Sequence, residues 1–463
     1  MSYIKPIMAA ILILIVLAGC SYLDPYLAAF REDRTPALPS QFTLYSEKDD
    51  SSEPWWKEFG SAELDALVAE AISGNFSVQE AWARLEQARY TAVKSGADLY
   101  PAINFASGGS YAGSHAATGS KSSTEAWSLG FSASYEVDLW GKVKADRESS
   151  LLLVQASEND VKTAILSLTG QLVENWLALI SARQQETLFN QQLEIQEKLL
   201  DLIKLRFSRG KSTALDIYQQ QQTIEKIKAA LIPVKSSQEK INRLLALLTG
   251  KTSFYQDTLS QFAFPQLQEV PAIGLPADLI AQRPDIRSAG SKLKSSEWEV
   301  SVAKADRLPA LKLTASHTYN GDELGSIFDN WLLNLAGNIT GPIFDGHRRQ
   351  AEVERVKAVA DERLATYRKT VVTAISEVEN ALTEEDQYRK TVASLVNQLR
   401  LSEETMREAR RRYLNGSTDF VNVLKEELNF LQLQFDTIKA REQMIAARIH
   451  LYKALGGSWL DNS

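Results

Sequence analysis

Within the stretch EAWSLGFSASYEVDLWGK at residues 125–142, apolar and polar positions alternate from Trp127 to Leu139. Its apolar positions are Trp127, Leu129, Phe131, Ala133, Tyr135, Val137 and Leu139. A period of two predicts a β-strand with one apolar face and one polar face. Most of the remaining chain has the pattern of helices, so this apolar face has few apolar partners in the same chain.

The composition is that of a folded protein. The chain has 463 residues, of which 44% are hydrophobic and 24% are charged. Its formal net charge is -7. Phosphate binding needs an excess of clustered Lys and Arg, so this charge argues against nucleic acid as a partner.

The N-terminus has the features of an export signal. In MSYIKPIMAAILILIVLAGC, Lys5 precedes an apolar run that is too short to span a bilayer, and small residues precede Cys20. We expect a signal peptide at 1–19. Residues 17–20 (LAGC) resemble the bacterial lipobox, which predicts a covalent lipid on Cys20 and a lipidated, extended segment at 20–60. Cys20 is the only cysteine, which excludes disulfides within one chain. No later run has 18 consecutive apolar residues, so no transmembrane helix is expected.

The chain contains a tandem repeat with an offset of about 206 residues. The segment that begins with ARLEQARY at 83 aligns with the one that begins with SKLKSSEW at 291. VEN at 173 aligns with VEN at 378, and RFSRG at 206 aligns with RYLNG at 412. We therefore expect a first repeat at 61–250, a linker at 251–275, a second repeat at 276–457 and a tail at 458–463.

Each repeat is predicted to contain two long helices, at 142–207 and 214–248 and at 346–414 and 418–455. The first helix of each pair lacks proline and would be roughly 100 Å long at 1.5 Å per residue. Pro233 is expected to bend or loosen the helix at 214–248. Val371, Ile375, Val378 and Leu382 have the spacing of a coiled-coil seam.

Four strands are expected, in two hairpins: 101–112 with 126–139, and 310–320 with 331–344. Their length suits tilted strands that cross a bilayer, and small polar residues between apolar ones suit a barrel with a wet lumen. The half-buried edge of a β-sandwich would show the same alternation. A sheet in a membrane must close into a barrel of about eight strands or more. Four strands per chain therefore predict a wall that several copies share.

Three segments resemble signatures of the TolC-like outer membrane factors, in the lipoprotein branch (NodT-like) that serves RND-type tripartite efflux systems. They are EPWWKEFGSAELDALVAEAISGNF from Glu53, GLPADLIAQRPDIRSAGSKL from Gly274 and PIFDGHRRQAEVE from Pro342. The resemblance implies an α+β membrane protein and a homotrimer. Its copies would share a twelve-stranded transmembrane β-barrel, built from four strands per chain, and a periplasmic α-barrel of coiled-coil-like helices.

The resemblance also implies partners and a role. The family is a passive exit duct, to which a periplasmic adaptor (membrane fusion protein) and an inner-membrane RND-type transporter deliver substrates. The helix turns would be the periplasmic tips that the adaptor contacts. The candidate contacts are Gly210, Lys211, Ser212, Gly416, Ser417 and Thr418. From the residues alone, both glycines also fit left-handed helix ends, and Ser212 or Ser417 fits the start of the next helix.

The family's tip lock maps onto Asp216 and Tyr413, where a phenol would donate to a carboxylate. A basic lock residue of some members falls on Thr418, so that salt link is not expected here. The family's constriction maps onto Val421, Asn422 and Lys425, which predicts a neutral-to-basic pore with Val421 as an apolar pinch. Lys425 is equally consistent with a solvated helix face.

No enzyme motif is complete. RGKST at 209 lacks the first glycine and the preceding strand of a phosphate-binding loop, and no serine lies in a GxSxG elbow. The four histidines are scattered, so no metal site is expected, and no cofactor besides the lipid on Cys20. The alternative to an export duct is a lipid-anchored coiled-coil structural protein of the cell envelope. Such a protein would have no use for duplicated hairpins of bilayer length.

Overall fold

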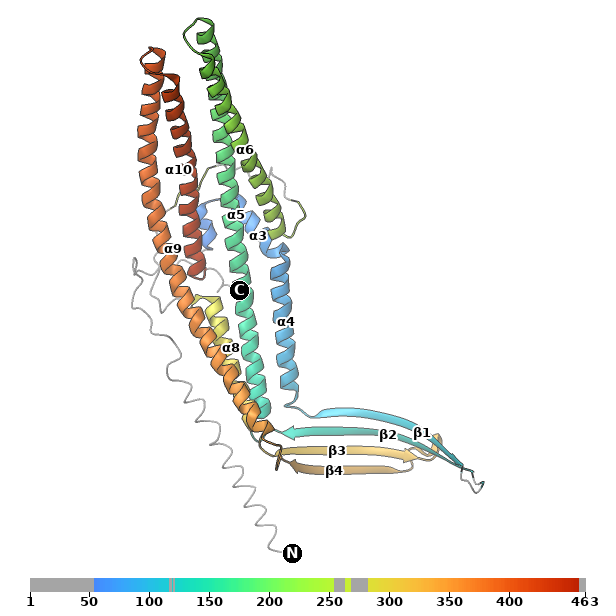
Figure 1. Ribbon diagram of the computed structural model, residues 1–463. Coiled ribbons are helices and arrows are strands. Elements are labelled where there is room, and N and C mark those ends of the chain that lie inside the picture. Colours follow the sequence, from blue (N-terminus) through green and yellow to red (C-terminus); the bar gives the residue numbers. More distant parts are fainter. Residues whose placement is uncertain (1–53, 116–118, 120, 254–262, 268–281, 458–463) are drawn as a thin grey trace. The chain divides into compact units, whose positions relative to one another are not determined.

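The computed structural model describes residues 54–115, 119, 121–253, 263–267 and 282–457 (Figure 1). The predicted signal peptide at 1–19, Cys20 and the tail at 458–463 lie outside these ranges, as do most of the segment at 20–60 and of the linker at 251–275. The chain divides into two compact units. We call residues 83–159 and 286–370 the strand unit, and the described parts of 37–82, 160–285 and 371–463 the helix unit.

The strand unit holds one antiparallel sheet in the order β1-β2-β3-β4 (Figure 1). Its strands are β1 (Ala102–His115), β2 (Lys121–Val137), β3 (Ala310–Gly321) and β4 (Trp331–Thr340). The first hairpin is longer than predicted, because polar residues assigned to its turn continue the ladder as far as the pair His115 and Lys121. The fourth strand ends at 340 rather than 344, since Pro342 lacks the N–H that a ladder requires.

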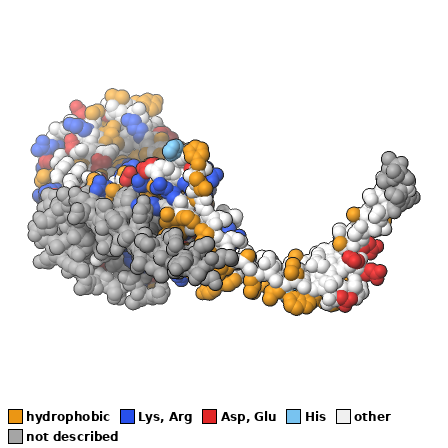
Figure 2. Space-filling view, turned by 90° about the horizontal axis from the view of Figure 1, so that it is seen from below, with side chains coloured by type: hydrophobic (Ala, Val, Ile, Leu, Met, Phe, Trp, Pro, Cys, Tyr) orange, Lys and Arg blue, Asp and Glu red, His pale blue; other side chains and the backbone are white. Residues whose placement is uncertain are grey.

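Strand register places the apolar side chains of all four strands on one face. One cross-strand row contains Phe105, Phe131, His317 and Leu333, and the next contains Ile103, Ala133, Ala315 and Leu335. The aromatic rings of Trp331 and His317 stack at 5.6 Å. These large apolar residues are mostly exposed in one chain, as Ile103 (74%) and Leu335 (72%) illustrate. Figure 2 shows hydrophobic side chains gathered along one margin of this sheet.

The opposite face of the sheet is polar and small. It carries Ser, Thr, Asn, Ala and Gly, with Leu332 as the one large apolar exception. Glu136 and Lys312 are cross-strand partners on this face, and Asn338 lies next to Lys312. The alternation seen at residues 125–142 therefore extends across the whole sheet.

The strand unit also contains α8 (Pro284–Ala305, from residue 286) and most of α4 (Phe76–Ala97). Close contacts between small side chains hold the helices together: Ser95 and Ser150 are bonded at 3.0 Å and Ser149 and Ser295 at 2.8 Å. An apolar cluster then packs α8 against the first part of α9. It contains Val300, Ala303, Val353, Val356 and Ala360.

The two repeats each contribute two long helices, as predicted. They are α5 (Lys142–Ser208, 67 residues), α6 (Ala214–Leu248, 35), α9 (Arg348–Leu414, 67) and α10 (Phe420–Ala454, 35). The predicted starts at 346 and 418 are thus two residues early. In the helix unit, α5 and α6 form one hairpin and α9 and α10 another (Figure 1). Val371, Val378 and Leu382 are at most 2% exposed, in agreement with the predicted seam.

Two details of these helices concern Pro233 in α6 and the apolar character of α5. Helix α6 continues through Pro233, and a cluster of Phe189, Ile227 and Val234 packs at this level. That packing offsets the roughly 3 kcal/mol that an internal proline costs. Within the described ranges, α5 has one window that is long and apolar enough to cross a bilayer, but 56% of it is buried, as in a core helix of a folded protein.

The helix unit begins with a short helix, η1 (Trp55–Phe59), followed by α3 (Ala62–Gly74). Trp55 is 2% exposed and stacks on Tyr452 of α10 at 5.5 Å. The Tyr452 hydroxyl donates to Glu58, and burial together with this carboxylate raises the pKa of the phenol. Aromatic packing therefore fixes residues 55–59 against α10.

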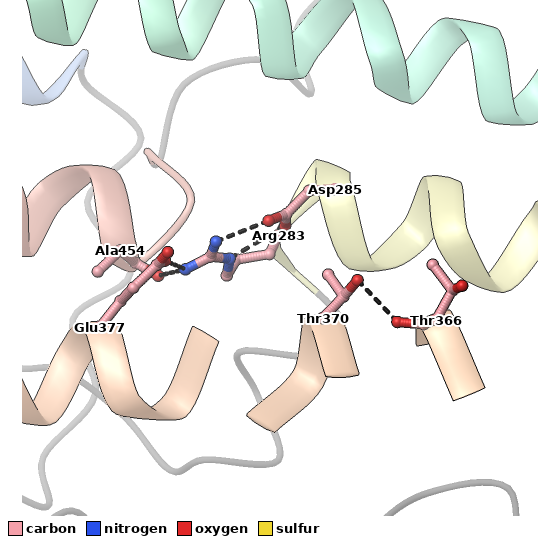
Figure 3. A network of polar contacts seen from close by, with 6 residues as sticks. All are labelled: Arg283, Asp285, Thr366, Thr370, Glu377 and Ala454. Atoms are coloured by element: carbon pink, nitrogen blue, oxygen red, sulfur yellow. Dashed lines mark hydrogen bonds and ion pairs between the residues drawn. The ribbon is translucent and has the colours of Figure 1, made fainter. Parts of the chain in front are cut away.

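The two repeats close the ends of their helix hairpins in equivalent places with different residues. In the first repeat, Asn75 accepts from the backbone N–H groups of Ser77 and Val78 and donates to the Leu248 carbonyl at 2.9 Å. In the second, Arg283 donates to the Ala454 carbonyl and to Asp285 and Glu377 (Figure 3). Each residue joins the start of one helix to the end of another.

Candidate functional site

The two hairpin turns of the helix unit have the same backbone design. Gly210 and Gly416 have positive φ angles of 68° and 75°. In the first turn, Gly210 N–H donates to the Phe207 carbonyl and Lys211 N–H to the Arg206 carbonyl. The second turn repeats both bonds from Gly416 and Ser417. This is the Schellman ending, so the expectation of left-handed helix ends at the two glycines is confirmed.

Helix α6 starts at Ala214, as predicted, whereas α10 starts at Phe420, two residues later than predicted. The N-cap residues of both helices are not the serines expected from the sequence. Thr213 caps α6, and it forms a capping box with Asp216. Ser212 is not the cap, because its hydroxyl donates to Asp216 at 2.7 Å. Helix α10 starts after Asp419, which forms no side-chain cap, so Ser417 is not its cap either. The remaining adaptor-contact candidate, Thr418, accepts from Asn422 at 2.8 Å.

The predicted lock residues are close to the turns but are not bonded to each other within one chain. Asp216 accepts from Ser212 and Thr213. The Tyr413 ring packs against Phe420 at 5.4 Å, with the guanidinium of Arg206 4.6 Å above it. Tyr413 is 7% exposed, and its hydroxyl has no hydrogen-bond partner among the described residues. A buried donor without an acceptor is costly, so a further acceptor for this hydroxyl would be stabilising.

The constriction candidates share one side of the first turns of α10. Val421, Asn422 and Lys425 are exposed, whereas Phe420 and Val423 are buried in a cluster with Ile203. The exposed set is therefore free to face a lumen or solvent. The adaptor candidates Gly210, Lys211, Gly416 and Ser417 are exposed as well, and Ser212 and Thr418 are half-buried.

A buried polar layer, which the sequence reasoning missed, links all four long helices near the tips. Glu427 of α10 is 4% exposed, and it accepts from Arg410 of α9 at 2.7 Å and from Gln196 of α5 at 2.8 Å. Gln220 of α6 donates to Gln196 at 2.7 Å. The signal was present in the sequence: Phe420, Val423 and Glu427 follow the 3–4 spacing, so a carboxylate occupies a core position.

Further polar contacts continue between α5 and α10. Ser181 donates to Glu442 at 2.6 Å, and Gln192 donates to Gln434 at 3.0 Å. Burial raises the pKa of Glu442, although the Ser181 hydroxyl opposes the shift. Polar contacts therefore alternate along the seam between the two hairpins with apolar ones such as that of Phe189 with Phe435.

An ionic cluster lies further along α10. Glu174 accepts from Lys453 at 3.0 Å, and its carboxylate is 3.5 Å from the imidazole of His450. The bond to Glu174 raises the pKa of His450. Among the described residues, no group of three or more His, Cys, Asp or Glu side chains is arranged to hold a metal ion.

Comparisons with known proteins agree on one family. The model of the outer membrane efflux protein family matches residues 67–251 and 275–457, which cover both repeats. The pyoverdine export outer membrane protein OpmQ of Pseudomonas aeruginosa is 32% identical over 443 residues, or 91% of this chain and 92% of OpmQ. The probable outer membrane lipoprotein SilC of Salmonella typhimurium is 25% identical and covers 96% of this chain and 97% of its own.

A solved structure of the outer-membrane channel OprN is 26% identical, has a TM-score of 0.81, and covers 91% of this chain and 98% of its own. The matches span both repeats and the strands between their helices. An efflux duct in the outer membrane, rather than an envelope structural protein, thus accounts for the strand wall and for the long helices. The chain belongs to the outer membrane efflux protein family.

Proposed function

We propose that three copies of the chain form one passive exit duct, with a twelve-stranded barrel in the outer membrane. The observation that carries this proposal is the register of the sheet, which puts every apolar row on one face and leaves β1 and β4 as unpaired edges in a single chain. Unpaired edges are not tolerated in a bilayer. Pairing β4 of one copy with β1 of the next satisfies both edges and closes the wall.

The helices form the periplasmic part of the proposed duct. Each 67-residue helix is roughly 100 Å long, and three copies supply enough long helices to enclose a tube that no single chain could enclose. The tips at Gly210 and Gly416 then face a periplasmic adaptor, which connects the duct to an inner-membrane transporter of the RND type. The exposed turn residues Lys211 and Ser417 are candidate adaptor contacts.

The resting duct is closed at the tips. Asp216 of one hairpin is the proposed acceptor for the unpartnered Tyr413 hydroxyl, and Val421, Asn422 and Lys425 line the constriction. The lack of an acceptor for that hydroxyl among the described residues supports this assignment. With no carboxylate among these three residues, the pore is less favourable to cations than an acidic ring would be.

Cys20 is the proposed site of a lipid anchor, in line with the description of the relative SilC as a probable lipoprotein.

The cargo is proposed to be a large polar organic molecule of the siderophore class. The polar face of the sheet is compatible with such a molecule, since its side chains are small and Glu136 and Lys312 are cross-strand partners of opposite charge. The relative OpmQ is described as a pyoverdine exporter.

The proposal is tested by the mass and the conductance of the purified complex. Light scattering of the detergent-extracted protein, corrected for detergent, should give the mass of three chains, and reconstitution in planar bilayers should give channels. Asp216→Ala and Tyr413→Phe should each increase the open fraction, whereas Asp201→Ala, on the exposed side of α5, should not. A single-chain mass in several mild detergents, with no conductance, would refute the shared barrel.

A further inference from the structure

The segment between β4 and α9 carries the most exposed large apolar side chains of the described chain. Ile343 and Phe344 are 103% and 85% exposed, although they precede a helix that is well packed. Burial of a large apolar side chain stabilises a protein by about 1.5–3 kcal/mol, so a fully exposed pair forgoes much of that gain. An exposed apolar pair of this size indicates a contact with a partner outside the chain.

This pair continues an apolar surface. The last row of the apolar face of the sheet contains Val137, Leu311 and Ile339, from β2, β3 and β4, at the same end of the strands. Leu139, which is 43% exposed, lies beyond the row, and Tyr100, which is 73% exposed, precedes β1 near this end of the sheet. The Trp140 indole is fixed there by a 2.7 Å bond to the Pro309 carbonyl. Amphipathic aromatic rings beside an apolar band mark the boundary of a bilayer.

The carboxylates of this junction are already engaged. Asp306 accepts from Lys142 at 2.5 Å and from Arg349 at 3.0 Å. Asp138 accepts from the backbone N–H groups of Val143 and Lys144 at the start of α5. Asp306 and Asp138 thus already have hydrogen-bond donors from neighbouring residues.

Three basic side chains remain without a carboxylate. Lys144, Arg307 and Arg348 are exposed, and none of them forms an ion pair with any residue that the structure describes. They belong to the first turn of α5, the turn after α8 and the first residue of α9. All three therefore lie just past the ends of the strands, at the level where the apolar surface stops.

We propose that this junction binds anionic phospholipid of the periplasmic leaflet. Ile343 and Phe344 insert at the acyl boundary, and Lys144, Arg307 and Arg348 bind lipid phosphate groups. The inference rests on the lipid-facing strand wall of the proposed function, and it adds a headgroup preference that the wall alone does not require. One Lys or Arg near an anionic surface contributes about 1 kcal/mol, or about fivefold in affinity.

The test is a lipid titration of the purified full-length complex in detergent. Short-chain phosphatidylglycerol, short-chain phosphatidylcholine and inorganic phosphate are added separately while thermal unfolding is followed. We expect phosphatidylglycerol to raise Tm at a concentration about tenfold lower than the concentration of phosphatidylcholine that gives the same rise. This difference should shrink at 0.5 M salt.

Two variants and a control make the test specific. The triple variant Lys144→Gln, Arg307→Gln, Arg348→Gln should lose the preference for phosphatidylglycerol and keep the response to phosphatidylcholine. Ile343→Ser with Phe344→Ser should weaken the response to both lipids. The matched triple variant Lys226→Gln, Lys240→Gln, Arg400→Gln removes three exposed charges from α6 and α9 and should behave like the parent protein.

Three results would overturn the proposal: equal responses to both lipids, an equal loss of preference in the control variant, or a response to inorganic phosphate that matches the response to phosphatidylglycerol. The last result would indicate a general anion site. Conductance of the same preparations separates this failure from failure of the duct. A conducting trimer without headgroup preference refutes the lipid site alone, and a preparation with neither trimers nor channels refutes the duct.

Discussion

Arg283 closes the end of helix α10, since its Nη1 atom lies 2.8 Å from the carbonyl oxygen of Ala454. The same guanidinium binds Asp285 and Glu377, and its side chain is 9% exposed. In the first repeat the neutral Asn75 makes the corresponding bond to Leu248. The second repeat thus uses an ion-paired group where the first uses an amide.

Arg283→Met should destabilise the helix unit by roughly 2–3 kcal/mol, because it leaves the Ala454 carbonyl and two partly exposed carboxylates without their donor. Asn75→Ala should cost about 1–2 kcal/mol, as the loss of a capping residue does. Thermal unfolding followed by circular dichroism would rank the two. Arg389→Met, at a half-exposed arginine paired with Glu385, is the control, and a larger loss there would contradict this account.

Two glutamates of α10, the buried Glu427 and the half-buried Glu442, should respond in opposite directions to replacement by glutamine. The pKa of Glu442 is raised by burial, so its contribution to stability is full below the unfolded pKa and is lost as the pH rises through the folded pKa. Glu442→Gln should therefore raise Tm at pH 7.5 and have little effect near pH 4. Glu427→Gln should lower Tm at pH 7.5, because it weakens the bond from Arg410. Stabilisation by both substitutions would show that the polar layer has no structural role.

His450 should make the helix unit slightly pH-dependent. Its pKa is raised by Glu174, and Glu384 is 3.8 Å away while Lys453 opposes protonation. The stability that it contributes is complete below about pH 6.5 and is lost as the pH rises through the folded pKa. His450→Gln should remove this part of the slope of Tm between pH 6 and 8, and His347→Gln should leave it. The effect is small because the side chain is half exposed.

The glycines with positive φ differ in what surrounds them. An added Cβ at Gly416 would meet nothing within 4 Å, so Gly416→Ala should cost only the backbone strain of about 1–2 kcal/mol. At Gly250 the same atom would lie 2.2 Å from the Gly74 carbonyl oxygen. Gly250→Ala should therefore reduce the yield of folded protein far more. Equal yields and equal Tm values for the two variants would contradict the close approach.

Neighbouring residues of β4 should tolerate charge very differently. Leu335→Arg puts a cation on the apolar face and should cost about 2–4 kcal/mol if that face meets the bilayer midplane. Asn334→Arg puts it on the polar face and should be nearly neutral for assembly. The yield of heat-resistant trimer in the outer membrane fraction would distinguish them. Similar yields would indicate that neither face contacts lipid.

The regular elements were predictable because their patterns are periodic and uninterrupted. The proline-free runs of the long helices and the glycines after them predicted helix ends at 207 and 414, within one residue of those at Ser208 and Leu414. Strand ends were predicted less well. The extent of β1 and β2 depends on pairing of polar residues such as Ser114 with Ser122, which carries no hydrophobic signal.

The local structure of the candidate site was predictable from the sequence only where the backbone geometry of a helix end defines it. Gly210 and Gly416 follow from helix termination, whereas the contacts of Tyr413 with Arg206 join residues more than 200 positions apart in the sequence. The buried layer around Glu427 was missed for the same reason: its partners Arg410 and Gln196 come from two other helices. Only packing reveals which polar side chains of an amphipathic helix face each other.

Helices α5 and α9 have the same length, 67 residues each, although their sequences differ between the two repeats. The equal lengths indicate that insertions and deletions are not tolerated within these helices. A single inserted residue would turn all that follows by about 100° and shift it by 1.5 Å, which would move every buried contact to the wrong side. The β-hairpins have no such constraint at their turns, and there the two halves differ in length. Insertions and deletions in relatives should therefore collect in the hairpin turns and leave both helix lengths unchanged.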